Sequence, residues 1–135
     1  MTRKQRSADI VITVLVVVHF IIAAVHGQAH DGAVVPVSTP ANIFIWTVIV
    51  MAPFVGVALL WFGSTSLGSW VLVTSLAGSL IFGVVNHFVL DSPDLVSHVA
   101  TAWRTLFGST AVLLALTEAL GTGLAFRRAT QARMR

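Results

Sequence analysis

Residues 10–25 read Ile-Val-Ile-Thr-Val-Leu-Val-Val-Val-His-Phe-Ile-Ile-Ala-Ala-Val, an apolar run in which only Thr13 and His19 are polar. Such a run is typical of a helix that crosses a hydrocarbon core, which takes about 20 residues. The rest of the chain is similar, since 56% of its 135 residues are hydrophobic and only 10% are charged. With a mean hydropathy of +0.91, it is too apolar for an ordinary soluble domain. The chain is therefore expected in a lipid bilayer.

Three further apolar segments follow the first and are separated by short polar stretches. Together they predict an all-α integral membrane four-helix bundle in a single domain, with spans at about 9–27, 40–62, 68–90 and 93–126. Thr39 and Ser92 each precede a proline, a pattern that indicates an N-cap followed by the first helical position. Pro53 lies inside the second span, where it is expected to kink the helix.

The basic residues lie almost entirely at the two ends of the chain, which argues against nucleic acid as a partner despite a pI of about 11.2. They are Arg3, Lys4 and Arg6 before the first span and Arg127, Arg128, Arg133 and Arg135 after the last. Four spans place both termini on one side of the membrane, and the positive-inside rule predicts that this side is cytoplasmic. The protein is thus expected to be a multi-pass protein of the cell (plasma) membrane.

This topology collects imidazole and carboxylate groups at the opposite, extracytoplasmic face. The residues concerned are His26, His30, His87, Asp91, Asp94 and His98. They form three pairs with a spacing of four, and on a helix each such pair projects from one face. There is no cysteine, so any metal ligands must be nitrogen or oxygen.

The sequence therefore predicts a transition-metal site that takes Cu, Zn, Fe or Mn. His26, His87, Asp94 and His98 are the leading candidate ligands, and His30 and Asp91 follow. The alternative for each residue is structural: a histidine at a membrane boundary can be satisfied by water, and an aspartate in a Ser-Pro turn can serve as a helix cap.

Residues 94–98, Asp-Leu-Val-Ser-His, have an Asp-x3-His spacing that resembles part of the copper-ligand motif in the C subunit of membrane-bound methane and ammonia monooxygenases. The motif has a further histidine about thirteen positions beyond the first, and the present chain has an alanine at position 111. The resemblance covers only these five residues, so we do not assign the chain to that family.

Two ionisable residues are expected deeper in the bilayer. His19 lies on the same helical face as His26, and Glu118 falls within the fourth span. Either could act as a proton relay below the metal site, because intramembrane ionisable groups are often functional. The alternative is that each is a neutral, hydrogen-bonded packing residue.

Three functions remain open at this stage, and catalytic residues cannot be assigned. The first is a metalloenzyme or metal-handling protein with the site described above. The second is an electron-transfer protein with haem b held by His26 and His87 as axial ligands. The third is a non-catalytic accessory subunit of a larger membrane complex. The possible protein partners are a homo-oligomer or a larger membrane complex. Whether the protein is an enzyme is left undecided.

Overall fold

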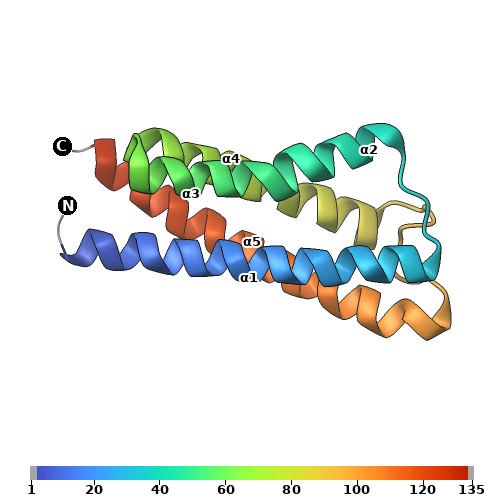
Figure 1. Ribbon diagram of the computed structural model, residues 1–135. Helices are drawn as coiled ribbons and strands as arrows, with labels where there is room; N and C mark the ends of the chain where they lie inside the picture. Colours follow the sequence, from blue (N-terminus) through green and yellow to red (C-terminus); the bar gives the residue numbers. More distant parts are fainter. Residues whose placement is uncertain (1–2, 134–135) are drawn as a thin grey trace.

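The computed structural model describes residues 3–133, and all of its regular elements are helical, which confirms the predicted fold class. Arg135, one of the predicted terminal charges, lies outside the described residues. The elements in chain order are α1 (Arg3–Ala33), α2 (Thr39–Phe44), η1 (Ile45–Met51), α3 (Ala52–Phe62), α4 (Thr65–Val84), η2 (Val85–Val89) and α5 (Thr101–Arg133), where η denotes a π-helix (Figure 1).

Four helical segments are long and apolar enough to cross a membrane, as the sequence predicted. They run over Gln5–Ala33, Thr39–Phe62, Thr65–Val89 and Thr101–Ala132. Figure 1 shows both chain ends at the same end of the bundle, which we call the terminal end. The opposite end, which we call the loop end, carries the two longer connections, residues 34–38 and 90–100.

Two apolar cores hold the helices together. The larger core, nearer the terminal end, is built around Ile12, Leu60, Leu72, Leu76 and Ala125. The smaller core lies at the loop end and consists of Ala29, Val99 and Phe107. Helix α5 packs against both α1 and α4, and α3 packs against α4. The small core at the loop end adjoins three buried polar residues, His26, His87 and Thr110.

The second span is made of α2, η1 and α3 rather than one regular helix. Ser38 caps its start, with Oγ accepting a hydrogen bond from the Ala41 amide at 3.4 Å, so Thr39 is the first helical residue and not the predicted cap. The irregularity expected at Pro53 takes the form of η1, which ends just before it. A proline has no N–H for the preceding turn, and a π-helical segment is one way to accommodate that loss.

The predicted start of the fourth helix at Pro93 is wrong, because α5 begins at Thr101. Residues 90–100 form a series of turns instead. The Ser92 hydroxyl accepts a hydrogen bond from the Asp94 amide at 3.3 Å, and the Val96 amide donates to the His87 carbonyl at 3.0 Å. These bonds replace the helical i to i+4 pattern and tie the loop back to η2.

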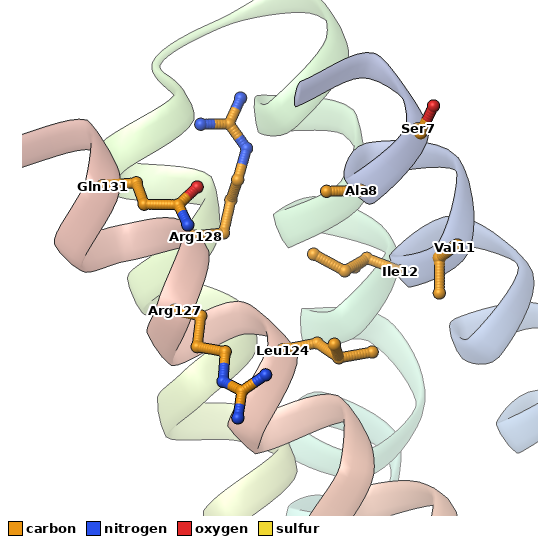
Figure 2. Close-up of a pocket in the computed structure, with 8 residues that line it drawn as sticks. All are labelled: Ser7, Ala8, Val11, Ile12, Leu124, Arg127, Arg128 and Gln131. Carbon is orange, nitrogen blue, oxygen red and sulfur yellow. The ribbon is translucent and has the colours of Figure 1, made fainter. Parts of the chain in front are cut away.

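An ion pair that the sequence did not reveal links α1 and α5 at the terminal end. The Arg128 guanidinium donates from Nε to Asp9 Oδ1 at 2.7 Å and from Nη2 to Oδ2 at 3.1 Å. Both side chains are buried. A small pocket of about 260 Å³ lies between the two helices. Figure 2 shows the residues that line it, Arg127 and Arg128 among them.

Candidate metal centre

Three of the six predicted ligands meet at the loop end of the bundle. His26 and His30 lie one turn apart on α1, and His87 lies on η2. One ring nitrogen from each residue can be chosen so that all three lie within 4.8 Å of one another. Residues His26 and His87 are 7% and 6% exposed, so this cluster is inside the protein rather than on its surface. We call His26, His30 and His87 the histidine cluster.

The elements that bring these rings together follow from the sequence in different ways. The spacing of four residues places His26 and His30 on one face of α1, as predicted. His87 comes from a π-helical segment, an irregularity that often occurs at functional sites. Because η2 continues α4, His87 lies about two turns after Ser79 in the same span, and both residues face α5. Ser79 bonds to Glu118 of α5, and His87 packs against Phe107 of α5.

Phe107 of α5 forms an apolar floor beneath the histidine cluster. Its ring centroid lies 4.7 Å from that of His26, 4.7 Å from that of His30 and 5.1 Å from that of His87. Phe107 is fully buried and belongs to the smaller apolar core. An aromatic wall of this kind excludes water, and electrostatic interactions are stronger where water is excluded.

A hydrogen bond to Thr110 determines which nitrogen of His26 carries the proton. His26 Nδ1 lies 2.8 Å from Thr110 Oγ1. The Thr110 hydroxyl donates to the Leu106 carbonyl at 2.7 Å, so it must accept from His26. His26 Nδ1 is therefore the protonated nitrogen, and its Nε2 presents a lone pair to the cluster.

Asp94 lies beside the other two rings. Its backbone carbonyl accepts from His87 Nδ1 at 3.3 Å. Its Oδ1 atom lies 3.2 Å from His87 Nδ1 and 3.3 Å from His30 Nε2, at ion-pair distance but without a hydrogen bond to either ring. These acceptors favour a proton on His87 Nδ1 and on His30 Nε2. The nitrogens left with lone pairs are His87 Nε2 and His30 Nδ1, and the latter is buried with no hydrogen bond to any described residue.

This assignment places two lone pairs face to face, because His26 Nε2 and His87 Nε2 are only 3.2 Å apart. Two acceptors at this distance repel each other unless a cation or an additional proton lies between them. An ion bound tetrahedrally to two imidazoles, with bonds of about 2.0 to 2.1 Å, would hold its nitrogens about 3.3 Å apart. The observed spacing fits that geometry.

The electrostatics of Asp94 agree with a role beside cationic groups. Burial by itself raises the pKa of this carboxyl. The close contact with His87 and the positive charges that His87, His30 and His26 can carry outweigh burial and hold the pKa of Asp94 below its ordinary value. Asp94 is thus kept as a carboxylate, the form that accepts hydrogen bonds from imidazole.

The remaining two predicted ligands lie outside the histidine cluster. His98 Nε2 and Asp91 Oδ1 are 3.6 Å apart, with side chains that are 47% and 92% exposed. His98 Nδ1 also donates to the Ser92 carbonyl at 2.9 Å. The expected convergence of Asp94 and His98 required a helix through both residues, and the turns of residues 90–100 separate them instead.

The two deeper residues, His19 and Glu118, lie together between α1 and α5. His19 Nδ1 is 3.9 Å from Glu118 Oε1, and the Ser79 hydroxyl donates to the same carboxyl oxygen. The two residues are only 1% and 3% exposed. Within residues 3–133, neither ring nitrogen of His19 makes a hydrogen bond.

A cavity of about 670 Å³ connects the histidine cluster with Glu118. The histidine cluster and Asp94 line its outer end, and Ser79 and Glu118 line its inner end. Sequence reasoning missed both this cavity and two residues of the site, Phe107 and Thr110. Thr110 is a polar residue in an otherwise apolar span, a signal that could have drawn attention to it.

Compared with known proteins, the chain matches no family model, no curated protein and no solved structure.

Proposed function

We propose that the protein is a membrane metalloprotein that binds one first-row transition ion in the histidine cluster. His26 Nε2, His87 Nε2 and His30 Nδ1 are the proposed ligands. The observation that carries this proposal is the 3.2 Å separation of two imidazole nitrogens whose other nitrogens are both engaged with acceptors. A bound cation would turn that repulsive contact into two favourable bonds.

The groups around the rings support the same conclusion. Histidines that bind metals commonly donate their second N–H to a carboxylate, carbonyl or hydroxyl oxygen, which fixes the ring and its tautomer. Thr110 has this position beside His26, and Asp94 has it beside both His30 and His87. Asp94 is thus proposed as an orienting residue, not as the direct ligand that the sequence suggested.

Three imidazoles leave a tetrahedral ion one open position, as in catalytic rather than structural metal sites. The adjoining cavity gives a small molecule access to that position. We therefore propose a metalloenzyme, with metal handling as the second possibility. An all-imidazole ligand set suits Zn, Cu or Fe, and such an ion could supply Lewis acidity or activate a water molecule.

The geometry favours a single ion over haem b. Axial ligands on opposite sides of one iron would be about 4 Å apart, given metal–nitrogen bonds of about 2 Å. They would also need the macrocycle between their rings. The rings of His26 and His87 instead meet edge to face at 4.8 Å, with their nitrogens 3.2 Å apart.

The orientation of the protein is part of the proposal. With Arg3, Arg6, Arg127 and the other terminal cations on the cytoplasmic side, the histidine cluster would open toward the extracytoplasmic face of the cell membrane. Metal would then be acquired from outside the cytoplasm.

Elemental analysis tests the proposal on protein purified in mild detergent without chelator. We expect about one Zn, Cu or Fe per chain in the wild type and loss of that metal in His87→Ala. His98→Ala is the matched control, because His98 lies outside the cluster, and it should retain the metal. A wild-type protein that holds no metal even after incubation with each ion would refute the proposal and favour a non-catalytic accessory role.

A further inference from the structure

The cavity next to the histidine cluster has a largely apolar wall and polar groups at its two ends. Phe20, Ala23, Ile49 and Leu114 contribute to a largely apolar wall. Its volume of about 670 Å³ is in the range of small-molecule sites, about 300 to 1,000 Å³. The cavity lies among all four spans, with lining residues from α1, α2, η1, α4, η2 and α5 (Figure 1).

The inner end of the cavity has hydrogen-bonding capacity that the protein does not use. Glu118 Oε1 accepts from Ser79, but no described residue donates to Oε2. His19 Nδ1 lies 3.9 Å from Glu118 Oε1, but His19 itself does not line the cavity. Polar groups left unpaired in a membrane interior are costly, so a bound group that pairs with Glu118 would be favoured.

The two polar ends are far enough apart to accommodate an elongated molecule. Thr110, which contacts His26, and Glu118 are separated by eight residues along α5. At 1.5 Å per residue, this separation corresponds to about 12 Å along the helix axis. A ligand that reaches both ends must therefore have an apolar body between a polar group at Glu118 and the part that approaches the metal.

We propose that the cavity binds a neutral lipophilic alcohol, with its hydroxyl at Glu118 and its apolar body directed toward the histidine cluster. A hydroxyl can both donate and accept, so it matches a carboxyl in either protonation state. A charged headgroup is disfavoured, because an additional charge at this depth is expensive. The inference that this alcohol is also the substrate class of the metal centre rests on the proposed metal function. The inference that its hydroxyl binds at Glu118 does not depend on the metal.

Photolabelling in lipid nanodiscs tests this inference, with a decanol that carries a diazirine as the probe. Peptide mass spectrometry should find the label on peptides that line the cavity, and 1-decanol should compete with it better than decane. Replacing Glu118 by Leu removes the partner of the hydroxyl. We expect competition by 1-decanol to weaken roughly two- to tenfold, the effect of losing one hydrogen bond.

A second variant separates cavity binding from general partitioning into lipid. Ala115→Phe adds a large side chain to the cavity wall and should abolish the cavity label. Ala119→Phe is the matched control, because Ala119 is exposed on the same helix and does not line the cavity, so its label should persist. Equal labelling of the two variants would overturn the inference, as would equal competition by decane and 1-decanol in the wild type.

Metal content is measured on the same samples, so the two proposals can fail separately. Protein that holds metal but shows no competed label loses the alcohol site and keeps the metal centre. Protein that is labelled as expected but holds no metal keeps the alcohol site and loses the metal centre.

Discussion

At the scale of single residues, the metal-facing nitrogens are set by acceptors on the far side of each ring. Thr110 holds His26, and Asp94 contacts both His30 and His87. Neither residue is a proposed ligand, yet each determines which lone pair points into the cluster. Their substitution should therefore weaken metal binding without removing a ligand.

Thr110→Val removes the hydroxyl that accepts from His26 and keeps a side chain of similar shape. We expect metal affinity to fall about 10- to 100-fold, the usual effect of losing such an orienting group. Thr110→Ser should retain most of the affinity. The measurement is competition for Zn²⁺ with a chromogenic chelator, and equal affinities for the two variants would contradict the role assigned to this hydroxyl.

Asp94→Asn tests the second orienting group by removing its negative charge at nearly constant size. The same titration should show a loss of about tenfold or more, because the amide is a weaker acceptor for His30 and His87. Asp91→Asn is the control, since the Asp91 side chain is 92% exposed and pairs with His98, outside the histidine cluster. An equal loss of Zn²⁺ affinity in Asp94→Asn and Asp91→Asn would indicate a general effect of loop charge and would contradict the orienting role of Asp94.

At the scale of helices, the terminal end depends on the buried ion pair between α1 and α5. Asp9→Leu would leave the Arg128 guanidinium buried without its carboxylate, and such a change costs about 3 to 5 kcal/mol. The double variant Asp9→Leu with Arg128→Met should recover most of the loss. Unfolding in mixed detergent micelles gives the free energies, and a double variant as unstable as the single one would show that the charge itself is needed.

The packing of α3 against α4 depends on a close approach of two backbones. A Cβ atom added at Gly68 would lie 2.7 Å from the Gly56 carbonyl oxygen, so the helices must separate to accept it. Gly68→Ala should destabilise the protein by about 1 to 3 kcal/mol. Gly123→Ala on α5 is the control, because a Cβ atom there meets nothing within 4 Å. The same unfolding assay compares them, and equal stabilities would contradict this packing account.

At the scale of the whole molecule, the four spans could be predicted because hydropathy depends on composition rather than on detailed packing. The pairing of His26 and His30 followed from helical periodicity alone. The environment of His98 could not be predicted, because Ser92 and Pro93 resemble a helix start whether or not a helix follows. In the structure Ser92 bonds locally and the loop attaches to η2, a tertiary preference that single-sequence patterns do not contain.

The orientation proposed for the protein is also tested at this scale. The chain has no cysteine, so single cysteines can be introduced as reporters. Val34 lies in the exposed connection at the loop end, and Ser64 lies in the turn between α3 and α4 at the terminal end, so Val34→Cys and Ser64→Cys report on opposite ends of the bundle. A membrane-impermeant maleimide applied to intact cells should label position 34 and not position 64. The reverse pattern would place the histidine cluster on the cytoplasmic side.

The most direct measurement of the central claim is X-ray absorption spectroscopy of the protein loaded with one equivalent of Zn²⁺. The proposed centre predicts three imidazole nitrogens at about 2.0 to 2.1 Å, together with the multiple scattering that imidazole rings produce. In His26→Ala this three-imidazole coordination should be lost. A spectrum with only oxygen ligands, or one unchanged in that variant, would contradict the claim that His26, His30 and His87 hold the ion.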